Sequence, residues 1–276
     1  MTMNISKTTT SPLRTLGMSS LLLLLTLGAG GTGADAMAQT AVAFSGDGFN
    51  TFEPSFSAVL GSLSATFTEV PRDTLANTVS TGGFSMIWLD GFSTFNGLPT
   101  AQLQNFVENG GTLVVQSPGF GGNSLSEFPK GSEIEQITYT GWDGNGEPEV
   151  RIMDSLHPLM AGLTNAGLNW KDANALNASG HTSGSIGGFH GLVDNGTSGQ
   201  WVTLVQDVGS GHLVYTFEDI SRRLAGEANG AQAADYLKNL VTYAVAVPEP
   251  STIVLGSLGA MLLWPVLRRR PASGRA

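Results

Sequence analysis

Three short stretches of the sequence place carboxylate, amide and hydroxyl side chains directly after apolar runs. The stretches are 47–50, 90–95 and 117–123, and they supply Asp47, Asn50, Asp90 and Ser117 with Phe49, Phe92 and Phe120 close by. Polar groups beside aromatic rings suit a sugar, whose hydroxyls need polar partners and whose C–H faces pack on rings. The other interpretation is that the Asp and Asn side chains cap helices and turns while the Phe side chains belong to the core.

Ser117 would act as a nucleophile only with a histidine base within hydrogen-bond reach. The four candidates are His157, His181, His190 and His212. His157 precedes Pro158, so we expect it to hold a loop, and His212 stands at the edge of a predicted hairpin. His181 and His190 flank a Gly/Ser-rich segment that could close over the site as a lid, which makes His190 a candidate ligand contact. The Gly-x-Ser-x-Gly pattern of a hydrolase nucleophile elbow is absent, so binding is favoured over hydrolysis.

The chain contains no cysteine. This excludes disulfides, Cys-ligated metal sites and a thiol nucleophile. Asp143 to Glu147 (DGNGE) alternates oxygen-bearing side chains like the start of a calcium loop, but the closing Glu of that loop is missing. A tight turn is the favoured interpretation, and we expect neither a metal nor a cofactor.

The polar stretches follow strands in a predicted β-α-β-α-β-α-β order. Apolar runs at 40–45, 65–70, 84–89 and 112–116 predict strands, and amphipathic patterns at 53–63 and 100–109 predict helices. This order indicates a parallel sheet with right-handed crossovers, and ligands bind such sheets at the carboxyl ends of the strands. The three polar stretches should therefore converge at one edge.

The later part of the sequence predicts antiparallel additions. Strands are expected at 133–140 and 149–153, and the runs 201–206 and 212–217 flank Gly209-Ser210-Gly211, which indicates a hairpin. A terminal helix is expected at 231–245. The prediction is an α/β fold, flavodoxin-like, with a mostly parallel sheet flanked by helices and an antiparallel C-terminal hairpin.

Both ends of the chain have the composition of targeting segments. Lys7 and Arg14 precede an apolar run, and Ala36 and Ala38 are the small residues that signal peptidase reads, so we expect cleavage after Ala38. At the other end, Val247, Pro248, Glu249 and Pro250 precede the apolar run 253–267 and the cluster Arg268, Arg269 and Arg270. That run predicts a short transmembrane helix with its arginines on the cytoplasmic side; a permanent tail anchor is the alternative.

This tail resembles the PEP-CTERM sorting signal of Gram-negative bacteria. The resemblance covers about thirty residues and rests on Pro248-Glu249-Pro250, the hydrophobic helix and the terminal arginines. It implies processing by an exosortase near the Pro-Glu-Pro, a transient contact with the inner membrane, and release to the cell surface or the surrounding matrix. Proteins with this tail commonly belong to bacteria that make exopolysaccharide or biofilm.

The charge of the domain between the two ends is strongly negative. The whole chain has a net charge of −9, but six basic and two acidic residues lie in the terminal segments. The domain therefore keeps 7 basic and 20 acidic residues, a net charge of −13. Nucleic acid is a poor partner for such a surface.

The middle of the chain resembles a class I glutamine-amidotransferase-like domain of the trehalose-utilisation type. The resemblance rests on Ile87 to Asp90, the helix ending at Gly110-Gly111, the strand Thr112 to Val115, and the stretch DSLHPLMAGL at 154–163. Catalytic members carry a Gly-x-Cys-x-Gly elbow, where this chain has Gln116-Ser117-Pro118-Gly119-Phe120. Amidotransferase activity is therefore not expected.

The sequence predicts three parts: a signal peptide (1–38), an amidotransferase-like α/β domain (39–247) and a sorting tail (248–276). The expected function is that of an exported, exosortase-processed surface or matrix protein whose non-catalytic domain associates with exopolysaccharide. A hydrolase of glycans or their substituents, and a purely structural surface protein, are the alternatives.

Overall fold

The computed structural model describes residues 41–45, 53–90, 97–116, 125–135, 137–139, 149–169, 178–218, 220, 224 and 230–245. The predicted signal peptide and the predicted sorting tail lie outside these ranges. So do the cleavage residues Ala36 and Ala38, the motif Val247 to Pro250, and the arginines 268–270.

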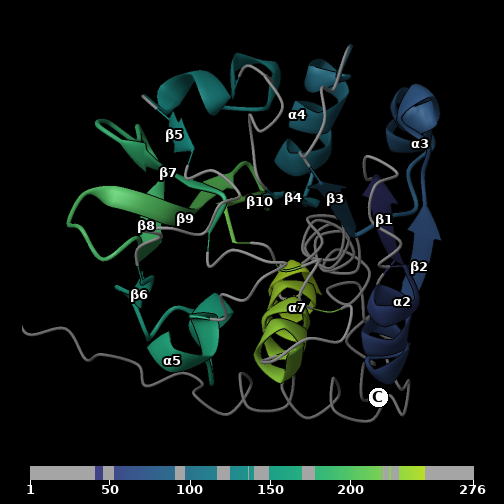
Figure 1. Ribbon diagram of the computed structural model, residues 1–276. Helices are drawn as coiled ribbons and strands as arrows, with labels where there is room; N and C mark the ends of the chain where they lie inside the picture. Colours follow the sequence, from purple (N-terminus) through teal and green to yellow (C-terminus); the bar gives the residue numbers. More distant parts are fainter. Residues whose placement is uncertain are drawn as a thin grey trace, which may run out of the picture. The chain divides into compact units, whose positions relative to one another are not determined.

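One half of the sheet is parallel (Figure 1). Its strands lie in the order β2-β1-β3-β4-β10, and each neighbouring pair is parallel. The bounds are Thr66–Glu69 for β2, Ala41–Ser45 for β1, Met86–Asp90 for β3, Thr112–Gln116 for β4 and Gly211–Thr216 for β10. Every residue of β3 and β4 is buried, as their continuous apolar runs predicted. β2 closes this half and is mostly exposed.

Helices cover both faces of the parallel half. α2 (Glu53–Ser62) and α7 (Gly230–Val245) contribute Leu60, Leu237 and Leu240 to a core with Trp88 and Val114. Because side chains alternate along a strand, the neighbouring strand residues point to the opposite face. On that face, α3 (Leu75–Thr81) and α4 (Thr100–Glu108) pack over a second core. The helices contribute Leu75, Leu103 and Val107 to it, and the strands contribute Ile87 and Leu113.

The other half of the sheet is antiparallel. β9 (Gln200–Val208) pairs with β10, with β8 (His190–Asp194) and with β7 (Gly180–Ser183). β5 (Ile137–Tyr139) pairs with β7, and β6 (Arg151–Ile152) pairs with β8. The sheet thus has ten strands among the described residues. The α/β class and the predicted hairpin are confirmed, while the antiparallel part is larger than that hairpin.

Short helices connect these strands. They are η1 (Arg72–Thr74), η3 (Leu125–Glu127), η4 (Gly131–Glu133), η5 (Pro158–Met160) and α5 (Asn165–Leu168). The predicted strand at 133–140 is shorter than expected, because Glu133 ends η4 and is held by an ion pair with Lys130 at 2.9 Å.

The turn between β9 and β10 packs closely on the end of α4. Ser210 N–H donates to Glu108 O at 3.1 Å, and His212 N–H donates to Gly111 O at 3.2 Å. A Cβ on Gly211 would lie 2.2 Å from Gly111 O and 2.3 Å from Val107 O, both of them backbone atoms that cannot move aside cheaply. Glycine at this position therefore sets how closely the hairpin approaches the parallel strands.

We predict that Gly211→Ala lowers the free energy of unfolding by about 2 kcal/mol or more, because the added methyl group collides with backbone. Urea denaturation followed by circular dichroism measures the change. Gly61→Ala is the matched control: Gly61 lies in α2, and a Cβ added to it would have no atom within 4 Å, so the variant should lose no stability. Equal stability of the two variants would contradict the argument.

Candidate functional site

Four polar side chains lie directly opposite one another at the carboxyl edge of the parallel strands. Asp90 of β3 pairs with Gln116 of β4, Gln116 pairs with Thr216 of β10, and Thr216 pairs with Thr203 of β9. All four side chains are buried. Gln116 Nε2 donates to Asp90 Oδ2 at 3.4 Å. We call Asp90, Gln116, Thr216 and Thr203 the polar row.

Glu218 continues the polar row just beyond the end of β10. Thr203 Oγ1 donates to Glu218 Oε2 at 2.7 Å, and Thr216 Oγ1 donates to the same oxygen at 3.3 Å. Tyr236 of α7 donates its hydroxyl proton to Thr203 Oγ1 at 3.3 Å, which ties the helix to this network. Glu218 Oε1 is buried and has no partner among the described residues.

Burial controls the protonation of this network. Glu218 has no exposed surface. Loss of hydration raises the pKa of its carboxyl from 4.5 to about 7, although hydrogen bonds from Thr203, Tyr236 and Thr216 oppose the rise. Burial and the neighbouring charge of Glu218 also raise the pKa of Tyr236, so its phenol stays protonated as a donor. The carboxyl of Glu218 can thus gain or lose a proton near neutral pH.

His181 is the histidine nearest to this edge in the strand pairing. Two residues before it, Ser179 donates both its Oγ–H and its N–H to Phe217 O, at 3.1 and 2.7 Å. His181 is buried, its Nδ1 has no partner among the described residues, and burial lowers the pKa of its ring.

Of the predicted site residues, Asp90 and His190 lie within the described residues. Asp90 ends β3 at the carboxyl edge, as predicted. Asp47, Asn50, Phe92 and Ser117 lie outside the described residues. The sequence did not predict the other residues of this edge, because Gln116 and Thr216 looked like ordinary strand residues and Glu218 is remote in sequence from Asp90. The signal that could have found them is a polar residue at the last position of each strand.

The structure does not bring His190 to Asp90. His190 begins β8, four strand spacings from β3, or roughly 19 Å. Its Nε2 lies 3.0 Å from Asp154 Oδ2, and 58% of its side-chain surface is exposed. The two histidines expected to flank a lid lie in strands β7 and β8 of the sheet.

The segment between those strands is anchored by hydrogen bonds from its backbone to two glutamates. Ser185 N–H donates to Glu135 Oε2 and Gly188 N–H donates to Glu133 Oε2, both at 3.3 Å. The hydrogen bond from Lys130 is the main cause that lowers the pKa of Glu133, so this anchor is a carboxylate. The segment is therefore a strand connection fixed by two glutamates.

His157 has the loop-holding role that the sequence predicted. Its Nδ1 accepts a hydrogen bond from Leu159 N–H at 3.3 Å and so caps η5. Burial lowers the pKa of this ring, which keeps Nδ1 an acceptor.

The described residues contain no group of three or more His, Asp or Glu side chains placed to hold a metal ion. The predicted turn at Asp143 to Glu147 lies outside them. Within the described parts of the chain, no helix has both the length and the apolar character needed to cross a bilayer. The apolar run 253–267 falls outside those parts.

Comparison with known proteins gives likenesses of fold. No protein-family profile matches the sequence, and no curated protein is significantly similar to it. A GMP synthase component from Thermoplasma acidophilum is 10% identical over 75% of this chain and 96% of its own, with a TM-score of 0.49. A ThuA-like protein from Bacteroides uniformis is 11% identical over 78% and 94%, with a TM-score of 0.44. PurLQS from Thermotoga maritima is 11% identical over 74% and 98%, with a TM-score of 0.45.

At these identities and TM-scores the likenesses assign neither a family, nor an activity, nor a ligand to this chain. The chain spans only about a third of the β-galactosidases that it also resembles. The fold class itself is shown by the mixed sheet with helices on both faces.

We predict that Glu218→Gln makes stability less dependent on pH. Because the folded-state pKa of Glu218 is raised above 4.5, the folded protein binds the proton more tightly than the unfolded chain. The wild type should therefore lose on the order of 3 kcal/mol from this group as pH rises from about 4.5 through about 7. Gln mimics the protonated form, so the variant should be more stable than the wild type at about pH 8 and close to it at about pH 5.

Urea unfolding at both pH values measures the difference. Glu69→Gln is the matched control, since Glu69 lies on the exposed strand β2. A Glu218 variant that is destabilised at both pH values would show that the carboxylate itself is needed by the fold.

Proposed function

We propose that this chain is an exported binding protein whose α/β domain recognises a hydroxyl-rich ligand, in the first place exopolysaccharide, at the carboxyl edge of β3, β4 and β10. The observation that carries the proposal is Glu218, which is fully buried and has one carboxylate oxygen without a partner among the described residues. A buried oxygen without a partner costs about 1 to 3 kcal/mol, so a ligand that displaced the groups covering Glu218 and supplied a donor would recover that cost.

A sugar fits this requirement better than an anion does. Asp90 and Glu218 place two carboxyl groups at the edge, and the polar row adds the hydroxyls of Thr203 and Thr216. Carboxyl and hydroxyl oxygens accept hydrogen bonds from sugar hydroxyls, whereas an anionic ligand would meet repulsion from a domain with a net charge of −13.

The targeting segments support an extracellular setting for this binding. We propose that signal peptidase cleaves after Ala38 and that an exosortase processes the tail near Pro248-Glu249-Pro250. The C-terminal apolar run then holds the protein at the inner membrane only in transit. The mature protein reaches the cell surface or the matrix, where exopolysaccharide is the available polymer. We propose no amidotransferase activity, since the chain has no cysteine.

We predict that Glu218→Gln weakens binding of the protein to the exopolysaccharide of the producing bacterium by about tenfold, since a hydrogen bond to a charged group contributes about 1.5 kcal/mol or more. Isothermal titration calorimetry at about pH 8 measures the affinity, where the same variant is expected to be the more stable protein. A loss of binding therefore cannot be attributed to unfolding. Glu69→Gln should bind as the wild type does.

Two outcomes would overturn this function. Unchanged binding by Glu218→Gln would leave the buried network with a purely structural role. Turnover of the polysaccharide or its substituents that Ser117→Ala abolishes, with no stable binding, would favour the alternative of a hydrolase with His181 as its base.

The sorting route has a separate test. We predict that replacing Pro248, Glu249 and Pro250 together by Ala leaves an uncleaved protein in the inner-membrane fraction, because the exosortase motif is lost while the apolar run remains. Fractionation and immunoblotting of the producing bacterium measure its location. Replacement of Ser251 and Thr252 by Ala is the control and should leave processing intact. Normal release of the triple variant would refute an exosortase signal.

A further inference from the structure

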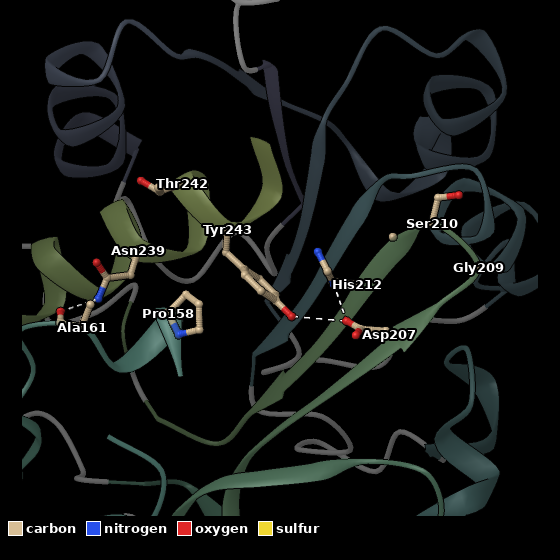
Figure 2. Close-up of a pocket in the computed structure, with 10 residues that line it drawn as sticks. Pro158, Ala161, Asp207, Gly209, Ser210, His212, Asn239, Thr242 and Tyr243 are labelled. Carbon is tan, nitrogen blue, oxygen red and sulfur yellow. Dashed lines mark hydrogen bonds and ion pairs between the residues drawn. The ribbon is translucent and has the colours of Figure 1, made fainter. Parts of the chain in front are cut away.

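A second polar cluster lies at the opposite end of β10, around a depression of about 600 Å3. Figure 2 shows its walls: α7 contributes Asn239, Thr242 and Tyr243, and the β9–β10 hairpin contributes Asp207, Ser210 and His212. His212 pairs with Thr112 at the amino end of β4, four residues before Gln116. The depression is therefore about 13 Å along the strands from the polar row, and it shares no residue with it.

One carboxylate holds the aromatic wall of this depression. Asp207 Oδ1 lies 2.6 Å from His212 Nδ1 and accepts the hydroxyl proton of Tyr243 at 3.3 Å (Figure 2). The rings of His212 and Tyr243 stack with centroids 4.0 Å apart and planes at 24°. His157 packs edge-on against Tyr243 at 5.3 Å. Burial and the charge of Asp207 raise the pKa of Tyr243, so it stays a phenol.

Helix α7, which forms one wall of the depression, is fixed to η5. Asn239 Nδ2 donates to Leu159 O at 3.0 Å and to Ala161 O at 2.8 Å, which joins the helix to η5 and the residue after it. The hairpin wall is fixed by its backbone bonds to Glu108 and Gly111. Both walls are thus in place before a ligand arrives, which reduces the ordering that binding requires.

Most of the polar atoms that line this depression and have no hydrogen-bond partner among the described residues are acceptors. Because His212 uses Nδ1–H toward Asp207, its Nε2 is an acceptor in the neutral ring. Asp207 Oδ2, His212 Nε2 and Asn239 Oδ1 have no hydrogen-bond partner among the described residues, and the Asp207 side chain is 77% exposed. Ser210 and Thr242 add two hydroxyls at the rim. Among the described residues that line the depression, none is Lys or Arg.

We propose that this depression is a second ligand site, which binds a neutral carbohydrate ring through its hydroxyl groups. Acceptors beside an apolar aromatic wall match a molecule that presents hydroxyl donors and C–H faces. An acidic sugar is disfavoured, because its carboxylate would face Asp207 without a Lys or Arg in the described lining to balance it. The volume is within the range of small-molecule sites in proteins.

Calorimetric titration of the protein with cellohexaose, maltohexaose and hexagalacturonate tests the proposal. At least one of the two neutral oligosaccharides should bind, and hexagalacturonate should bind at least tenfold more weakly. Asp207→Asn should weaken neutral binding by about tenfold, since it removes a charged acceptor. Thr242→Trp should abolish it by filling the depression without changing the Asp207 network. Asp235→Asn is the matched control on the same helix and should bind as the wild type does.

The two proposed sites are separable in this experiment. Glu218→Gln should leave the oligosaccharide affinity that depends on Asp207 unchanged, whatever it does to exopolysaccharide binding. The second site is overturned if neither neutral oligosaccharide binds, if hexagalacturonate binds best, or if Asp207→Asn and Thr242→Trp both bind as the wild type does.

Discussion

Strands β3 and β4 are buried on both faces, and the rest of the fold depends on that constraint. A strand of this kind needs cover on both sides, which α2 and α7 supply on one face and α3 and α4 on the other. No polar side chain can be placed cheaply in the middle of such strands, because an unpaired polar group in a core costs several kcal/mol. The polar residues of β3, β4 and β10 therefore gather at the strand ends, at the carboxyl edge with Asp90 and Gln116, and at the amino edge with His212.

The carboxylates at the two edges differ in how far they are exposed to water. At the carboxyl edge Glu218 is fully buried, and the hydroxyls of Thr203, Thr216 and Tyr236 offset only part of the lost hydration, which is why its pKa rises to about 7. At the amino edge Asp207 remains largely in water while it holds His212 and Tyr243. A buried network of the first kind costs stability that apolar residues of similar volume would not cost.

The sequence predicted the parts of the fold whose pattern is local. These parts can each be recognised from the residues of one segment alone: the apolar runs of β1, β3 and β4, the amphipathic helices α4 and α7, and the Gly-rich hairpin turn. β7 and β8 were missed, because Gly180 to Asp194 is rich in Gly and Ser and has few consecutive apolar residues. Their strand structure comes from pairing with β9, which no local pattern reports.

The sequence predicted where on the sheet the candidate site lies, but not which residues surround Asp90. Asp90 could be placed because it follows an unmistakable strand, but its neighbours are set by register. Gln116, Thr216 and Thr203 become opposite one another only when three strands pair in a particular alignment. His190 illustrates the same limit, since its place opposite Val205 in β9 is set by strand pairing and not by the Gly/Ser-rich segment beside it.

Strand β10 connects the polar row at one of its ends with the depression at the other. It pairs with β9 along its whole length and with β4 from His212 to Thr216, so both of its ends are held by neighbouring strands. The tight approach of Gly211 to Gly111 fixes one end, and the bond from Ser179 to Phe217 fixes the other. A site whose walls are already fixed loses little conformational entropy when a ligand binds to it.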